Sequence, residues 1–277
     1  MNSKPLKLNV ELEFAAKSHP GMVRSHNEDS ITMAPECGLA ILADGMGGYN
    51  AGEVASGMAT AVLRNDLMGD LSEWYPELTR RGTAKLHTVL QARVTGANTA
   101  IYQSALSQPQ YAGMGTTLAM ALFRDRWLTT AHIGDSRIYR LRGEDYSQIT
   151  RDHSLLQDQI DAGMVTPEQA KLSMNKNLVT RALGVDPTVE AEINDYETEF
   201  GDIYLLCSDG LSDMVPDAEV RETLQLLGSN LELAASTLIQ QANDYGGRDN
   251  VSVILIKVQP SSKASRKLCF NATVARL

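Results

Sequence analysis

Aspartate recurs in this sequence beside glycine or another polar residue, at the edges of short apolar runs. An aspartate at a strand end can point its carboxylate out of the sheet, and a following glycine lets the backbone turn sharply and leaves its carbonyl accessible. Carboxylate and carbonyl oxygens are hard ligands that suit Mg²⁺ or Mn²⁺. The segments of this kind are Asn27-Glu28-Asp29, Asp44-Gly45-Met46-Gly47-Gly48, Gly134-Asp135-Ser136-Arg137, Ser208-Asp209-Gly210 and Arg248-Asp249-Asn250.

Each of these segments alone also suits an ordinary turn, because Asp-Gly is a common turn dipeptide. Their number is what points to a shared site. Carboxylates that converge without a cation repel one another, and their pKa values rise sharply. Divalent cations remove this repulsion, so the sequence indicates a site for a pair of such ions.

The elements that would position these segments predict an α+β fold. Alternating or short apolar runs predict strands, and longer stretches with helical spacing predict helices. Because the helices come in pairs and the strands in runs, the pattern does not favour a βαβ alternation. Strands are expected at residues 8–16, 38–43, 116–123, 127–133, 137–141, 189–196, 203–207 and 251–258, and helices at 51–67, 83–106, 217–227 and 231–245.

Two details of this pattern are specific. The run at 38–43 indicates a buried strand that ends in a turn at Asp44-Gly45. The close spacing of the runs at 116–123, 127–133 and 137–141 predicts an antiparallel meander.

Residues 8–258 are expected to form one domain. Within it, residues 152–184 are polar, interrupt the strand pattern and contain a helix start at Thr166-Pro167-Glu168, which predicts a small inserted flap. Residues 259–277 carry four basic residues and no acidic one, and we expect a flexible tail there.

The composition excludes several classes of protein. The chain has 277 residues, 43% hydrophobic and 21% charged, as in ordinary soluble globular proteins. Its net charge of −9 argues against nucleic acid as a partner, because phosphate backbones need a basic face. No apolar run reaches the roughly 18 residues of a membrane span, and the N-terminus lacks the apolar centre of a signal peptide. We therefore expect a cytoplasmic protein with no membrane partner.

The aspartate segments, with three others, resemble the motifs of the PPM-type (type 2C) metal-dependent protein serine/threonine phosphatases, and bacterial members in particular. The resemblance covers about residues 10–258, and eight motifs in the family's order make it specific. The motifs are Gly21-Met22-Val23-Arg24-Ser25-His26-Asn27-Glu28-Asp29, Asp44-Gly45-Met46-Gly47-Gly48, Gly113-Met114-Gly115-Thr116-Thr117, Gly134-Asp135-Ser136-Arg137, Asp152-His153-Ser154, Thr180-Arg181-Ala182-Leu183-Gly184, Ser208-Asp209-Gly210-Leu211 and Asp249-Asn250-Val251-Ser252.

The resemblance implies a four-layer αββα sandwich, with two central antiparallel sheets flanked by helix pairs and a flap beside the active site. It implies that Asp44 bridges two Mn²⁺ or Mg²⁺ ions and that the Gly45 carbonyl helps to hold one of them. Asp209 and Asp249 would bind one ion together with Asp44.

Further roles follow from the same resemblance. Glu28 and Asp29 would act mostly through bound waters. Arg24 would bind the substrate phosphate, since a guanidinium fork suits phosphate oxygens. Asp135, with Asp209, would match a third, weaker metal site of bacterial members.

The implied reaction is the hydrolysis of phosphoserine and phosphothreonine in proteins. Phosphate monoesters hydrolyse extremely slowly unaided. Two cations about 3.5–4 Å apart can share a water, lower its pKa toward neutrality and neutralise phosphate charge. The resulting hydroxide can attack phosphorus in line without a phosphoenzyme, in agreement with the lack of a Cys-x5-Arg loop. We expect a monomer that opposes a cognate Ser/Thr kinase in bacterial signalling.

One position departs from part of the family. Some members, mainly eukaryotic, have a histidine after the Asp-Gly pair, proposed as the general acid, whereas this chain has Met46. The general acid is therefore unassigned. His26 is the nearest histidine in sequence, but a lone histidine is more often structural.

Two alternatives stay open. Gly45-Met46-Gly47 between a strand and a helix, with Asp66 about 20 residues on, resembles a dinucleotide-binding fingerprint, although Asn50 stands at the third glycine position. An inactive, phosphatase-like binding module would keep the same fold, although every expected carboxylate is present.

Overall fold

The computed structural model describes residues 10–48, 51–78, 83–166, 169 and 178–261. Its strands are β1 (Val10–His19), β2 (Asp29–Ala34), β3 (Leu39–Met46), β4 (Gly115–Thr116), β5 (Leu118–Arg124), β6 (Trp127–Ile133), β7 (Arg137–Arg142), β8 (Asp145–Gln148), β9 (Glu192–Glu197), β10 (Ile203–Cys207) and β11 (Val251–Pro260). Its helices are α1 (Ala51–Leu78), α2 (Thr83–Ser107), α3 (Leu155–Asp161), α5 (Asp209–Ser212), α6 (Asp217–Leu227) and α7 (Leu231–Asp244).

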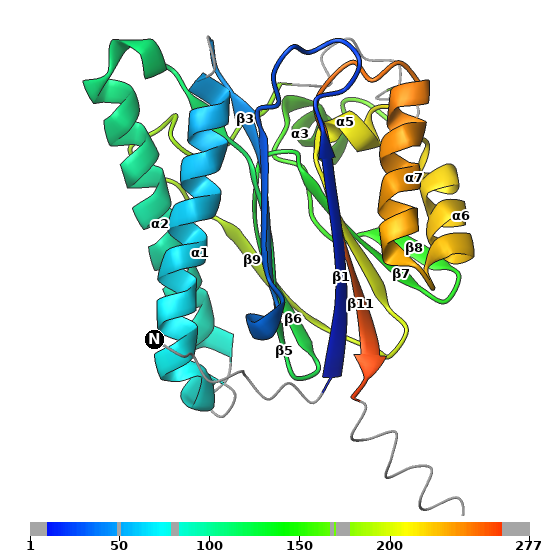
Figure 1. The fold of residues 1–277 in the computed structure, drawn as a ribbon. Helices are drawn as coiled ribbons and strands as arrows, with labels where there is room; N and C mark the ends of the chain where they lie inside the picture. The colour runs from blue at the N-terminus through cyan, green and yellow to red at the C-terminus, as the bar shows by residue number, and fades with distance from the viewer. Residues whose placement is uncertain (1–9, 49–50, 79–82, 167–168, 170–177, 262–277) are drawn as a thin grey trace, which may run out of the picture.

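The strands form two antiparallel sheets that pack face to face (Figure 1). One sheet has the order β1-β11-β10-β7-β8, and the other has the order β2-β3-β5-β6-β9 with β4 paired to β3. Helices α1 and α2 cover the outer face of the second sheet, and α6 and α7 cover the outer face of the first (Figure 1). This agrees with the α+β class that the sequence pattern predicts and with the four-layer αββα sandwich that the resemblance implies.

The central strands are buried on both faces, and the alternation of their side chains divides the core into three layers. In β3, Leu39 and Ile41 belong to the core under α1 and α2, whereas Ala40 and Leu42 belong to the core between the sheets. Strand β10 alternates in the same way between the central core and the core under α6 and α7. These strands therefore read in the sequence as continuous apolar runs.

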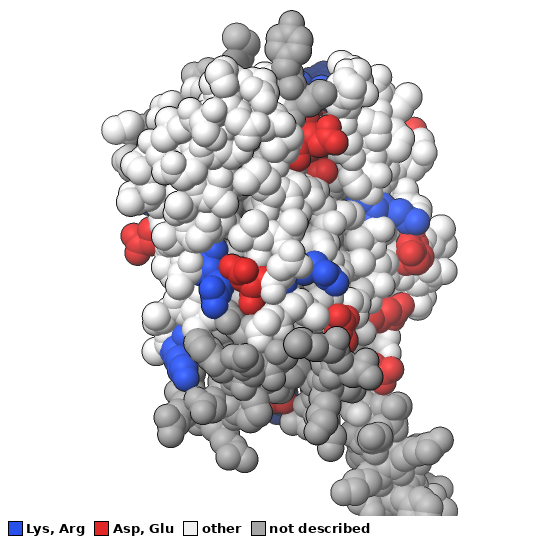
Figure 2. Space-filling model, turned by 60° about the vertical axis from the view of Figure 1, so that its left-hand side comes forward, with Lys and Arg blue, Asp and Glu red and all other residues white. Residues whose placement is uncertain are grey.

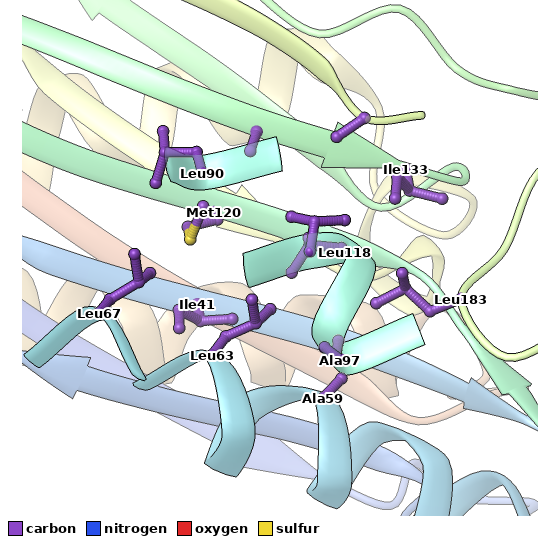
Figure 3. Packing of buried hydrophobic residues seen from close by; sticks show 14 of the residues in the cluster. Ile41, Ala59, Leu63, Leu67, Leu90, Ala97, Leu118, Met120, Ile133 and Leu183 are labelled. Carbon is purple, nitrogen blue, oxygen red and sulfur yellow. The ribbon is translucent and has the colours of Figure 1, made fainter. Parts of the chain in front are cut away.

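Helix α1 packs through residues four apart, which lie on one face of a helix (Figure 3). Leu63 and Leu67 belong to the same buried cluster as Ile41 and Met120 of the sheet. The preceding positions on the same face are alanines, which let the first turns of α1 approach the sheet closely. Fully burying one leucine contributes about 2 kcal/mol, so this face accounts for the pairing of α1 with the sheet.

Two sequence expectations need correction. Asp44 and Gly45 lie inside β3 rather than in a turn after it, because Asp44 pairs with Asp29 of β2 and Gly45 pairs with Thr116 of β4. The meander is also wrong in its third strand: β5 and β6 form a hairpin, but β7 joins β10 and β8 in the other sheet. Asp135 therefore lies where the chain crosses between the sheets.

Other boundaries differ in extent. Helix α1 continues to Leu78, beyond the predicted end at 67, and β2, β4, β8 and α5 were not predicted because each is short or lacks an apolar run. The flap expected at residues 152–184 contains α3, which was not predicted. Most of the helix predicted from Thr166 on lies outside the described residues, as do residues 262–277 of the tail.

The described helices are too short or too polar to cross a membrane. The dinucleotide-binding alternative fails on the fold. Its fingerprint needs a parallel βαβ unit, whereas β3 pairs antiparallel with β2, β4 and β5.

Candidate metal centre

The loops at one end of the sandwich enclose a pocket of about 290 Å³. This end carries α3 and α5, at the top of Figure 1, whereas β1 begins and β11 ends at the opposite end. Both sheets contribute to the pocket. Its lining residues are Arg24, Glu28, Asp44, Gly45, Met46, Gly47, Thr117, Asp135, Val179, Asp209 and Asp249.

Asp44 is held from both sides of β3. Its cross-strand partner in β2 is Asp29. On the other side its backbone N–H donates to Oγ1 of Thr117 at 2.9 Å, and its carbonyl accepts from the Thr117 N–H at 2.9 Å. The hydroxyl of Thr117 also lies 2.6 Å from Oγ of Ser136, the residue after Asp135. One threonine therefore ties the backbone of Asp44 to the segment that carries Asp135.

Gly45 cannot carry a side chain, because the start of α1 approaches its backbone too closely. A Cβ at Gly45 would lie 2.1 Å from the carbonyl oxygen of Gly52. The Gly45 N–H donates to the carbonyl of Glu28 at 3.1 Å, which fixes the loop that carries Glu28 against β3.

Asn250 clamps the loop between β1 and β2. Its Oδ1 accepts from the Glu28 N–H at 2.7 Å. Its Nδ2 donates to the carbonyls of Pro20 at 3.0 Å and His26 at 2.8 Å. The clamp joins residues more than 200 positions apart and brings Glu28 beside Asp249.

Asp209 reaches the pocket as the first residue of α5, directly after β10. The next residue must be glycine, because a Cβ at Gly210 would lie 1.9 Å from the carbonyl oxygen of Asn250. This close approach brings Asp209 and Asp249 into one pocket.

Burial raises the pKa values of the pocket's acidic residues, and their mutual repulsion raises several of them further. The pKa values of Asp29 and Asp135 rise to about 6, mainly through burial. Those of Asp44 and Asp209 rise well above their usual range, through burial first and then through neighbouring aspartates. Burial also raises the pKa of Glu28. A cation in the pocket would reverse these shifts.

The donor atoms fit a hard divalent cation. Oδ2 of Asp29 accepts from Oγ of Ser208 at 2.8 Å, but its Oδ1 is buried without a hydrogen-bond partner among the described residues. No three described His, Cys, Asp or Glu side chains stand together as a ready-made metal cage. The carboxylates are nevertheless close enough to raise one another's pKa, so the pocket suits an ion that keeps several waters, as Mg²⁺ does.

Arg24 places a positive charge at this pocket. Its Nη2 donates to Oδ2 of Asp249 at 2.7 Å, and this contact raises the pKa of the guanidinium. The Arg24 side chain is 55% exposed. Its other N–H groups can therefore meet an anion that enters the pocket.

Seven of the eight residues singled out from the sequence line this pocket, and the eighth, Asp29, is the cross-strand partner of Asp44. The residues missed are those that hold the acidic residues in place: Thr117, Ser208 and Asn250. All three stand inside the quoted motifs, so the motifs were the available signal.

An αββα sandwich whose loops gather carboxylates in one pocket is the class of structure that the type 2C motifs imply. Comparison with known proteins agrees, because the family described as Protein phosphatase 2C matches residues 23–241. The chain belongs to this family.

Several relatives are similar over most of this chain. The serine/threonine protein phosphatase PstP of Mycobacterium tuberculosis is 40% identical over 252 residues, which are 91% of this chain and 46% of that protein. The chain thus spans about half the length of PstP. The serine/threonine phosphatase stp of Listeria innocua is 38% identical and is covered over 92% of its length, with 86% of this chain.

A solved structure is similar as well. It is the catalytic domain of the phosphatase PstP in complex with two manganese ions, with a TM-score of 0.77 and 40% identity. The similarity covers 90% of this chain and 99% of that one.

Proposed function

We propose that this chain hydrolyses phosphoserine and phosphothreonine in proteins with the help of two Mn²⁺ or Mg²⁺ ions. The observation that carries the proposal is the convergence of Asp44, Asp209 and Asp249 on one pocket beside Arg24. Membership of the type 2C family and the names of the relatives support it. The manganese ions in the similar PstP structure support the choice of metal.

Asp44, Asp209 and Asp249 would hold the ions, together with the carbonyl of Gly45 and with waters. Bound there, divalent cations supply Lewis acidity and lower the pKa of a coordinated water. The contribution of the protein is to fix the carboxylates: the backbone of Asp44 is held by Thr117, and Asp209 is held by the close approach of α5 to β11.

Arg24 would bind the phosphate of the substrate, with Asp249 orienting its guanidinium from one side. Glu28 and Asp29 would accept hydrogen bonds from waters around the ions. Asp135 would share a third, weaker ion with Asp209, since both line the same pocket.

Turnover assays test this function. The metal-free chain is mixed with a phosphothreonine peptide or with para-nitrophenyl phosphate, and Mn²⁺ or Mg²⁺ is then added. We expect phosphate release only after metal is added and its loss with a chelator. Full activity in excess chelator would overturn the two-metal mechanism, and no release with any metal would indicate an inactive, phosphatase-like module.

The physiological partners belong to the same proposal. We propose that the chain acts in the cytoplasm, as a monomer, on proteins phosphorylated by a cognate Ser/Thr kinase. Among the residues coloured in Figure 2, basic atoms are scattered and form no continuous band on the visible face, which supports protein rather than nucleic acid as the substrate. Comparing phosphopeptides before and after gene deletion would identify the substrates.

A further inference from the structure

A second, larger hollow adjoins the pocket of the metal centre. Its volume is about 690 Å³, and its lining shares Asp135 and Asp209 with that pocket. We call it the flank groove. One wall is the face of α3 with Leu156, Gln157 and Ile160, and the opposite wall is the segment 212–218 that joins α5 to α6.

A fixed ion pair forms part of the floor of the flank groove. Nε and Nη2 of Arg137 donate to Oδ2 of Asp152 at 3.0 and 2.7 Å. Nε2 of Gln148 donates to Oδ1 of the same carboxylate at 2.7 Å. Because Asp152 is buried and precedes α3 by three residues, these bonds hold the start of α3 against β7 and β8. The shape of the groove is therefore set by the fold.

Both walls of the flank groove carry apolar residues. Leu156 and Ile160 are four residues apart and share one face of α3. Met214, Val215 and Pro216 line the facing wall. The space between them suits an aliphatic chain, and a groove of this volume is large enough for more than one side chain.

Among the described residues that line the flank groove, acidic side chains outnumber basic ones. Arg137 is basic, and it is bound to Asp152. Asp217 lies exposed in the segment 212–218. A ligand that matches both properties has an aliphatic stem and a cationic head, which describes a lysine or arginine side chain.

We infer that the flank groove binds the part of a phosphoprotein next to its phosphorylated residue and selects a lysine or arginine there. This inference rests on the proposed function, which places the phosphate at the metal centre. A peptide that leaves the centre past Asp135 and Asp209 enters the groove directly, because the two hollows share these residues.

Paired phosphothreonine peptides test the inference. One peptide of each pair has an arginine at a chosen position, and the other has alanine at that position. The position is varied in turn over the four residues on either side of the phosphothreonine. We expect an arginine at one position to raise kcat/KM of the wild-type chain about fivefold, the ratio that corresponds to about 1 kcal/mol for an exposed ion pair. In the Asp217→Asn variant this preference should fall below about twofold on the same scale.

Two controls make the test specific. Glu222→Gln removes one exposed acidic charge from the same helix, outside the groove, and should keep the arginine preference. Para-nitrophenyl phosphate does not reach the groove, so Asp217→Asn should leave its hydrolysis unchanged. Equal loss of preference in both variants would indicate general electrostatic attraction and overturn the inference, as would a wild-type chain that treats all the peptides alike.

Failure of the proposed function gives a different result. If neither peptides nor the small ester are hydrolysed, the peptides are instead titrated against the Asp44→Asn chain in Mn²⁺ and followed by fluorescence anisotropy. The arginine peptide should bind the Asp44→Asn chain more tightly than the alanine peptide does. If the double variant Asp44→Asn/Asp217→Asn loses this difference, the result supports the groove independently of turnover. Binding that ignores the arginine overturns it.

Discussion

At the scale of single residues, the pocket concentrates negative charge that the fold alone does not neutralise. Asp44 and Asp209 are buried, and neighbouring carboxylates raise the pKa of each. Among the described residues that line the pocket, the basic one is Arg24, and it is bound to Asp249. Such an arrangement is unfavourable without a bound cation and favourable with one, so the same residues should affect both the stability of the chain and the proposed catalysis.

Asp44→Asn and Asp209→Asn should each abolish turnover without unfolding the chain. In the proposed mechanism, loss of a ligand would remove an ion needed to activate water, whereas loss of a repelling charge should raise the melting temperature of the metal-free chain. Steady-state kinetics and calorimetry check both effects, with the exposed Asp186→Asn as a control. Retention of more than about a tenth of kcat, a barrier change below about 1.4 kcal/mol, would contradict the assignment.

Arg24→Ala should raise KM for phosphopeptides more than it lowers kcat. Arg24 would bind phosphate in the ground state and in the transition state alike, and loss of one charge-assisted contact corresponds to roughly tenfold. Its ion pair with Asp249 is largely exposed, so the melting temperature should hardly change. Arg126→Ala, which removes a comparable exposed pair with Glu197, is the matched control. An unchanged KM with a lowered melting temperature would show that Arg24 is only structural.

Asp135→Asn should leave two ions bound and lower kcat. Asp135 lines both the pocket and the flank groove, and fewer protein carboxylates would hold an ion there, so that ion should be the weakest bound. Calorimetric metal titration and phosphopeptide kinetics on one sample decide the matter. If the metal titration and kcat are both unchanged, Asp135 binds no ion and is only part of the crossover between the sheets.

At the scale of elements, contacts between distant segments position the loops of the pocket. The loop between β1 and β2 is anchored by Asn250, the residue before β11, and the start of α3 is anchored by Asp152 to Arg137 of β7. Both anchors are side-chain hydrogen bonds between a loop and a neighbouring segment. A few polar residues therefore fix the positions of the pocket's loops relative to the two sheets.

Asn250→Ala should destabilise the chain and weaken metal binding together. The substitution removes three hydrogen bonds of a buried side chain, at about 1 kcal/mol each, so a loss of about 2–4 kcal/mol is expected. Urea unfolding measures the stability and calorimetry measures the metal affinity. Asn194→Ala removes one partly buried contact, to Glu192, and should cost less. Equal losses in the two variants would refute the clamp.

At the scale of the whole molecule, the stability of the metal-free chain should depend on pH through the buried carboxyls. The pKa values of Asp29 and Asp135 are about 6 in the folded chain and about 4 when unfolded. Between these values the folded chain binds more protons than the unfolded chain. The free energy of unfolding from these groups therefore falls as pH rises through this window.

Buried His132 acts in the opposite direction over part of this range, because burial lowers its pKa to about 4 and the unfolded chain then binds a proton that the folded chain does not. The contribution of the carboxyls is therefore measured as a difference between variants. Asp135→Asn should raise the melting temperature of chelator-treated protein more near pH 7 than near pH 5, because a pKa of about 6 leaves this carboxyl ionised mainly at the higher pH. A scanning calorimetry series on both chains checks this, and an equal effect of the substitution at the two pH values would contradict the linkage.

The sequence by itself determined the fold class, the order of the central strands along the chain and the acidic residues of the pocket. Apolar alternation is a local property, so strands such as residues 203–207 could be read directly. Asp44, Asp209 and Asp249 stood out because their residue types and neighbours form recognisable local motifs.

Only the tertiary structure decided how these segments meet. Asp44 belongs to β3 rather than to a turn because strands β2 and β4 pair with it, and β7 leaves the meander because β10 and β8 offer it partners in the other sheet. Arg24 meets Asp249 across 225 positions of sequence. The flank groove likewise exists only where α3 packs opposite the α5–α6 segment. Such pairings depend on which surfaces of distant segments pack against one another, and a local sequence pattern does not predict these contacts.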